Sequence, residues 1–212
     1  MSRVTQADTE TAPTAERLVF FTDAIAAIAL TLLILPLLET VTGADTTFKQ
    51  LIRDHIGAFG SFVLSFAVTF RLWWSHHRTF EHVETLRPAM VRASVVWAFA
   101  IVMLPISTAV IISFPASAGT VGLYGGTLVL ANGAMTVLAQ IIYRHPEVSA
   151  GRPAGTRADV QAHVAVLLVQ LLSTLVGAVF HERVNYWAFL LMFLSGPAVH
   201  LVKGRGQKAP EA

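Results

Sequence analysis

The sequence predicts an all-α membrane protein with six transmembrane helices. Of its 212 residues, 54% are hydrophobic and only 13% are charged, against about 25% charged residues in an ordinary soluble domain. So much apolar surface excludes intrinsic disorder, and it could not be hidden in the core of one small soluble domain. The chain also has no cysteine, which excludes disulfides and cysteine-ligated metal sites.

Apolar runs of the right length account for nearly the whole chain. A transmembrane helix needs about 20 mostly apolar residues. Residues 93–143 contain no Asp, Glu, Lys or Arg, and this stretch is long enough for two helices with a turn at 114–119. The six expected spans are 19–38, 56–74, two helices within 93–143, 160–180 and 184–202. Around them we expect a flexible tail at residues 1–16, without a signal peptide, a membrane domain at 17–203 and a short basic tail at 204–212.

The distribution of basic residues predicts the orientation. With six spans, both termini and the loops after the second and fourth spans lie on one side of the membrane. That side carries twelve Lys and Arg residues, against three on the other side, which are Lys49, Arg53 and Arg183. Because basic residues accumulate in cytoplasmic loops, we expect both termini in the cytoplasm.

The first span contains one carboxylate, Asp23, six residues and therefore about 9 Å deeper than Arg17. An unpaired charge there costs about 3 kcal/mol, so Asp23 must be paired, protonated or facing water. The second span ends at the same level in Arg71, Trp73, Trp74, His76 and His77. We therefore expect a network that joins Asp23 to Arg17 and to Arg71 or a histidine. Such a network is either a structural counter-ion arrangement or, as ionisable groups within spans often are, part of a functional site.

Beyond Asp23 the first span carries an apolar stripe. Ile28, Thr31, Leu32 and Leu35 follow at i, i+3, i+4 and i+7, which places them on one helix face. By pattern alone, such a stripe faces lipid or the protein core far more often than a pore. The alternative is an apolar constriction of a channel.

Two motifs resemble those of the lysosomal transmembrane potassium channel family and its bacterial relatives. The family signature Arg-x-x-x-Phe-Ser-Asp reads here Arg17, Phe21, Thr22 and Asp23, with threonine in place of serine, and Ala24 replaces the glycine that usually follows. The second motif, Trp-x-x-His-His-x-x-Phe, is present as the stretch from Trp73 to Phe80. The Leu104-Pro105 pair is also similar to the family. The resemblance extends from about Arg17 to Lys203.

The resemblance implies a homotetramer with a central pore lined by the first span of each chain. The pore would pass potassium with weak to moderate selectivity over sodium, in a bacterial plasma membrane. A ring of Ile28 would be its narrowest point, with Thr31 and Leu35 next and Leu32 on the adjoining face. No cofactor is expected besides the permeant potassium ion, and no nucleic acid partner. The structural polar network is expected to comprise Arg17, Phe21, Thr22, Asp23, Trp73, His76 and His77.

Other functions remain as alternatives. A proton-coupled secondary transporter would use Asp23 and the histidines of the second span as relays, and a structural membrane subunit is a third possibility. His76, His77, Glu81 and His82 could suggest a metal site, but no HExxH pattern is present. Since the sequence shows no nucleophile–base arrangement and no phosphate-binding loop, we expect no enzymatic activity.

Residues 120–125 are similar to a potassium-channel filter, Thr-Val-Gly-Tyr-Gly, with Leu123 inserted. In such a filter successive carbonyls face the ion, and one inserted residue rotates everything after it. We therefore expect the glycines here, with Gly126 and Gly133, to support close packing of helices instead.

Overall fold

The computed structural model describes residues 14–42, 46–149 and 155–181, and this part of the chain is built from helices joined by short loops. The helices are α1 (Ala15–Leu32), α2 (Leu35–Thr42), α3 (Phe48–Asp54), α4 (Ile56–Phe80), α5 (Pro88–Ser113), α6 (Ala118–Arg144), the short 3-10 helix η1 (Pro146–Ser149) and α7 (Arg157–Val179). Five helical stretches are long and apolar enough to cross a membrane: α1 with α2, α4, α5, α6 and α7. The expected sixth span, 184–202, lies outside the described residues.

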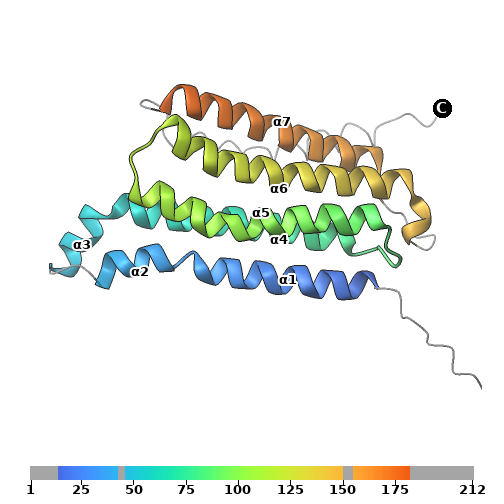
Figure 1. Cartoon of the computed structure of the whole chain (residues 1–212), viewed down its shortest axis with the longest axis horizontal. Coiled ribbons are helices and arrows are strands. Elements are labelled where there is room, and N and C mark those ends of the chain that lie inside the picture. The colour runs from blue at the N-terminus through green and yellow to red at the C-terminus, as the bar shows by residue number, and fades with distance from the viewer. Residues whose placement is uncertain (1–13, 43–45, 150–154, 182–212) are drawn as a thin grey trace, which may run out of the picture.

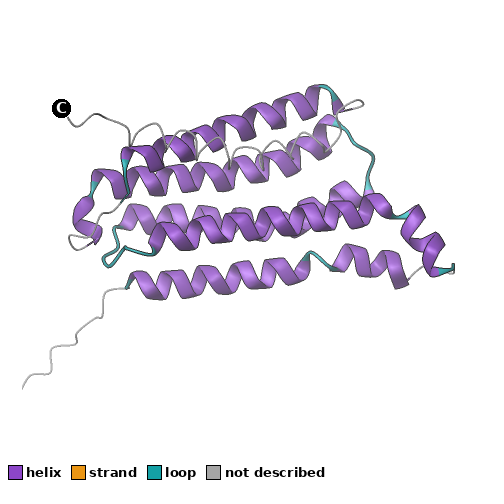
Figure 2. Cartoon of the chain, turned by 180° about the vertical axis from the view of Figure 1, so that it is seen from behind, coloured by secondary structure: helices purple, strands orange, loops and turns teal. Residues whose placement is uncertain are grey.

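The long helices form an antiparallel bundle (Figure 1). The α1–α2 stretch lies along one side, α4 and α5 occupy the middle, and α6 and α7 lie on the other side. The view from behind shows the same order (Figure 2). The largest buried side chains belong mainly to α5 and α6, among them Trp97, Leu104, Tyr124 and Leu128. The core of the chain therefore lies around α5 and α6, and α1 sits at the edge of the bundle.

The first predicted span is not one uninterrupted helix. The chain leaves the helical path at Leu33 and Ile34 and resumes it at Leu35. Pro36 explains the break, because a proline has no N–H to donate and its ring collides with the carbonyl of the residue four positions earlier, here Leu32. At its other end the helix begins at Ala15, inside the stretch expected as a tail.

Residues 120–125 belong to the first turns of α6. Ser117 and Thr120 form a capping box, in which each side chain accepts a hydrogen bond from the backbone N–H of the other, as is typical of a helix N-terminus. The Tyr124 hydroxyl is fully buried, 3.2 Å from Ser65 Oγ. These carbonyls are therefore used within a helix, and the segment is not a filter.

Only one glycine of α6 packs closely against another described helix. A Cβ on Gly125 would lie 2.5 Å from the Thr174 side chain of α7, so the two helices approach closely there. Gly122, Gly126 and Gly133 have no such neighbour within 4 Å in the described part of the chain. Among the described residues, the expected packing role is thus seen at Gly125.

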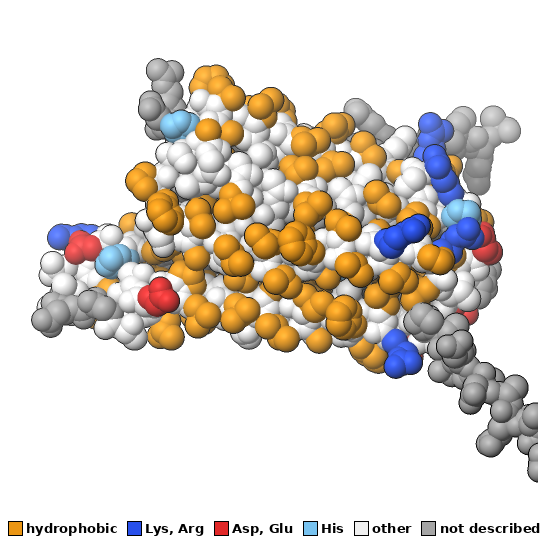
Figure 3. Space-filling view, viewed as in Figure 1, with side chains coloured by type: hydrophobic (Ala, Val, Ile, Leu, Met, Phe, Trp, Pro, Cys, Tyr) orange, Lys and Arg blue, Asp and Glu red, His pale blue; other side chains and the backbone are white. Residues whose placement is uncertain are grey.

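The surface agrees with a membrane-spanning bundle. On the face in Figure 3, apolar side chains form a broad band between two ends that carry the charged groups. One end, which we call the basic end, comprises the start of α1, the end of α4, the start of α5, the end of α6 and the start of α7. Its described basic residues are Arg17, Arg78, Arg87, Arg92, Arg144 and Arg157.

Candidate functional site

Helix α1 has two chemically different faces. Thr22, Ala26, Ala29 and Leu33 are buried, at spacings of four, three and four residues, and this face packs against α4 and α5. Its members are mostly small, which permits close approach between helices in a membrane. The sequence of α1 therefore fixes which side of the helix turns toward the rest of the chain.

The opposite face carries the predicted stripe, and in the single chain it is exposed. Ile28 is 60% exposed, Leu32 41% and Leu35 47%, and Thr31 is also exposed. The Thr31 hydroxyl donates its proton to the Ile28 carbonyl at 2.7 Å. The stripe crosses the break, since Leu35 is the first residue of α2. All four residues thus remain available to lipid or to another copy of the chain.

Asp23 connects α1 to α4. Trp73 Nε1 donates a hydrogen bond of 2.8 Å to Oδ1 of Asp23, and His77 Nδ1 lies 3.3 Å from Oδ2. The Asp23 side chain is 26% exposed. One carboxylate oxygen thus accepts a hydrogen bond from Trp73, and the other lies close to a ring nitrogen of His77, one helical turn further along α4. We call this arrangement the Asp23 anchor.

Aromatic contacts hold the two α4 side chains of the Asp23 anchor in place. The His77 ring lies 5.7 Å from Trp73 and stacks on Trp74 at 6.1 Å, between ring centroids. Trp73 also contacts Phe70 at 5.3 Å. Trp73, one of the residues of the expected network, is therefore a hydrogen-bond donor to the carboxylate.

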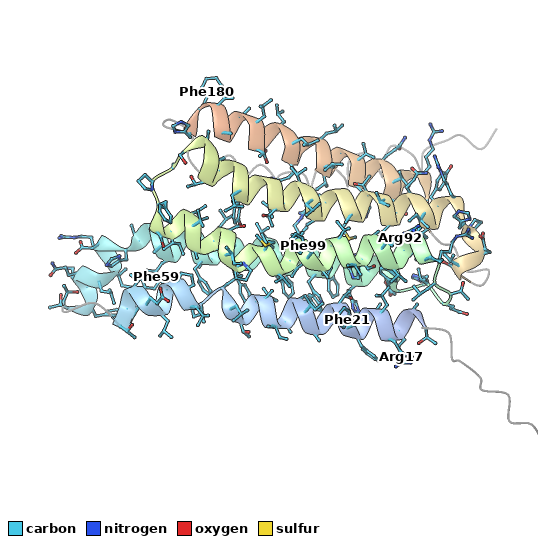
Figure 4. All side chains as sticks on the ribbon, viewed as in Figure 1. Arg17, Phe21, Phe59, Arg92, Phe99 and Phe180 are labelled. Atoms are coloured by element: carbon cyan, nitrogen blue, oxygen red, sulfur yellow. The ribbon has the colours of Figure 1, made fainter. Side chains whose placement is uncertain are left out.

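The expected link between Arg17 and Asp23 is not formed among the described residues, and this part of the prediction is wrong. Arg17 is exposed on the side of α1 that points away from the bundle (Figure 4). At about 100° per residue, positions six apart point about 120° away from each other around a helix. The prediction considered only how deep the two groups lie in the membrane. Their different positions around the helix axis keep them apart.

Three other members of the expected network lie apart from the carboxylate. Phe21 is exposed, and the buried Thr22 hydroxyl bonds to the carbonyls of its own helix, at 3.0 Å from Leu18 and 2.9 Å from Val19. His76 is fully buried and stacks on Trp97 of α5, with ring centroids 4.1 Å apart. Of the seven residues expected, the structure brings together Asp23, Trp73 and His77.

No motif or pattern in the sequence singled out Trp97. Its ring is fully buried between α4 and α5, and its stacking on His76 makes that histidine a packing residue of the core. Within the described ranges no three His, Asp or Glu side chains lie close enough to hold a metal ion.

Comparisons with known proteins agree with this geometry. The family model of the endosomal/lysosomal potassium channel TMEM175 matches residues 17–105, which contain most of α1 and the Asp23 anchor. The fold is similar to the crystal structure of a lysosomal potassium-selective channel TMEM175 homolog from Chamaesiphon minutus. The TM-score is 0.59 at 18% sequence identity, and the match covers 91% of this chain and 98% of that one. No curated protein is significantly similar to the chain.

Proposed function

We propose that this chain, whose residues 17–105 match the family model of the potassium channel TMEM175, forms a homotetramer whose central pore is lined by α1 and conducts potassium. The family match and the five described helical stretches of membrane-spanning length support a multi-pass membrane channel. The tetramer, the pore-lining helix and the identity of the constriction are our proposal. Each is argued below from the described residues.

The observation that carries the proposal is the exposed stripe on α1. An edge helix that packs by its small-residue face leaves Ile28, Leu32 and Leu35 outside the core of its own chain. Closed rotational symmetry would bring the same stripe of each copy to a common axis. Four such helices would surround a narrow passage with branched apolar side chains, which is one known form of channel constriction.

Thr31 supplies the polar atom within the stripe. A hydroxyl has one proton to donate and two lone pairs to accept with, and the Thr31 proton is committed to the Ile28 carbonyl. Its oxygen is then left as an acceptor one turn beyond Ile28. We propose that ions lose part of their hydration at the Ile28 ring and that four Thr31 oxygens partly replace the lost water.

The Asp23 anchor would position α1 rather than bind ions. The carboxylate already accepts a hydrogen bond from Trp73 and lies against His77 on α4, so an ion would have to displace one of these side chains. We propose that the basic end faces the cytoplasm of a bacterium, because basic residues predominate on that side.

The test combines mass with current. Purified protein in detergent should show four times the 22.9 kDa of one chain. In liposomes with a potassium gradient and without a proton gradient, it should give a voltage-driven current. The reversal potential of this current should depend on potassium. A mass of one chain, or no current under these conditions, would contradict the proposal.

A proton-coupled transporter remains the second candidate because a carboxylate and a histidine, Asp23 and His77, lie 3.3 Å apart between two spans. It predicts potassium movement only when a proton gradient is present. Collapsing the proton gradient with a protonophore therefore separates the two: a channel continues to conduct, whereas an obligate coupled transporter stops.

A further inference from the structure

A groove of about 400 Å³ lies along the last turns of α6, on the other side of the bundle from α1. The described residues that line it are Thr136, Val137, Gln140, Ile141, Arg144 and His145. They recur at spacings of one and three, so they form one strip of the helix surface. The groove runs toward the basic end.

The groove changes from apolar to cationic along its length. Val137 is 50% exposed, and Ile141 one turn further is partly exposed. Arg144 is exposed at the end of the helix. The seven residues from Val137 to Arg144 correspond to about 10 Å along the axis. A phospholipid matches this order, because its acyl chain lies deeper in the membrane and its phosphate lies at the membrane surface.

The cationic group of the groove is Arg144, and the acid closest to it along the chain already has other partners. That acid, Glu147, is paired with Arg87 Nη1 and His145 Nδ1, each at 3.0 Å from its Oε1. Arg144 forms no ion pair with a described residue. A planar guanidinium matches the geometry of a phosphate and binds it through two parallel hydrogen bonds.

We propose that this groove binds one anionic glycerophospholipid from the membrane leaflet at the basic end. The Arg144 guanidinium binds the phosphate, the Gln140 amide, about 6 Å deeper, donates to the glycerol ester region, and an acyl chain lies on Val137 and Ile141. The site does not depend on the pore, because α6 and α1 lie on different sides of the bundle.

The test measures lipid retention rather than current. The full chain is purified in neutral detergent and titrated with phosphatidylglycerol or phosphatidylcholine, and bound lipid is counted by native mass spectrometry. One basic residue near an anionic membrane surface contributes about 1 kcal/mol, so Arg144→Gln should weaken phosphatidylglycerol retention about fivefold. Phosphatidylcholine carries the same phosphate but no net charge, so its retention should fall less than that of phosphatidylglycerol.

Arg92→Gln is the matched control, because Arg92 is an exposed arginine at the start of α5 that does not line the groove. It should leave retention unchanged. Equal losses for the two variants would overturn the proposal in favour of a general charge effect, and so would no loss for Arg144→Gln.

Two further measurements keep the proposal testable if Arg144→Gln folds poorly. Gln140→Leu should also weaken phosphatidylglycerol retention, and an unchanged value would count against the site. Soluble glycerol phosphate should fail to displace the lipid, since it lacks the acyl chains that contact Val137. Displacement at concentrations comparable to the lipid would show a free-phosphate site and overturn the lipid assignment.

Discussion

Asp23 and Ile28 are coupled by helix geometry. Five residues of α-helix turn through about 500°, so these side chains point about 140° apart. Holding the Asp23 carboxylate against α4 through Trp73 and His77 therefore turns Ile28 away from the chain's own core. A polar contact on one side of α1 thus determines which residues its other side presents.

Replacing Asp23 with alanine should lower stability and reduce the yield of tetramer. Trp73 Nε1 would lose a charge-assisted acceptor, which costs about 1–3 kcal/mol, and the rotation of α1 would be less restricted. Thermal unfolding in detergent and size-exclusion mass measurement report the two effects. Glu39→Ala removes an exposed carboxylate from α2 and should change neither. A normal tetramer with normal current from Asp23→Ala would show that the anchor is dispensable.

Replacing Ile28 with asparagine should raise sodium permeation relative to potassium. The amide would compensate for one lost water contact of the ion, worth about 1 kcal/mol, which corresponds to about a fivefold change in the permeability ratio. Reversal potentials with potassium on one side and sodium on the other measure that ratio. An unchanged ratio would remove Ile28 from the constriction.

Residue types and spacing were enough to single out Asp23 and the end of the second span, but not all the contacts between them. A histidine was among the expected partners, and the structure places His77 there. Arg17 was expected too, yet it points elsewhere around the helix. Partner choice depends on the rotation of two helices against each other, and this rotation is set by packing that a single sequence does not display.

At the scale of helices, membrane spans were predictable because a run of apolar residues is itself the physical requirement for crossing lipid. The five described stretches include the predicted spans up to residue 180, within shifts of a few residues at most ends. The break at Leu33 and Ile34 and the short helix α3 were not predicted. Pro36 was visible in the sequence as a helix breaker, but whether a proline bends or interrupts a helix depends on neighbouring packing.

Two loops at the basic end are tied together by backbone and side-chain contacts. The N–H groups of Glu84 and Thr85 both donate to the Val148 carbonyl, at 2.9 and 3.2 Å. Arg87 pairs with Glu147 beside them. The segment between α4 and α5 is thereby attached to η1, after α6.

Glu147→Gln should weaken this attachment in a pH-dependent way. The pKa of the Glu147 carboxyl is lowered from its usual 4.5 by its own backbone N–H and by His145 and Arg87. A lowered pKa means that the charged form stabilises the fold above about pH 4.5, and that this stabilisation disappears as the pH falls through the lower folded-state value. Because the pair is exposed, the melting temperature should fall by only about 1–2 °C at neutral pH.

The melting temperatures of the Glu147→Gln variant and of the unmodified protein are measured from neutral pH down to acid pH. The two curves should converge at low pH, and Glu84→Gln, which changes an exposed carboxylate of the same region, should follow the unmodified protein. A difference that persists unchanged below the folded-state pKa would show that the pair does not carry the effect.

At the scale of the whole molecule, the position of α1 at the edge of the bundle matters most. Figures 1 and 2 show it flanking α4 and α5, with nothing described on its outer side. Composition established the membrane class, and the motifs indicated the family. The exposed side of an edge helix could not be read from the sequence, because an apolar stripe has the same pattern whether it faces lipid, protein or a pore.

The absence of cysteine from the chain allows the most direct test of the claim that α1 lines the pore. Single cysteines are introduced at Thr31 and Leu35 of the α1–α2 stretch. A control cysteine is introduced at Leu172 on α7, which like Leu35 is an exposed apolar residue. A membrane-impermeant cationic thiol reagent is then applied while potassium current is recorded from liposomes. Modification at Thr31 and Leu35 should block the current, and the Leu172 variant should be unaffected. Unmodified thiols and undiminished current at both α1 positions would contradict a pore lined by this helix.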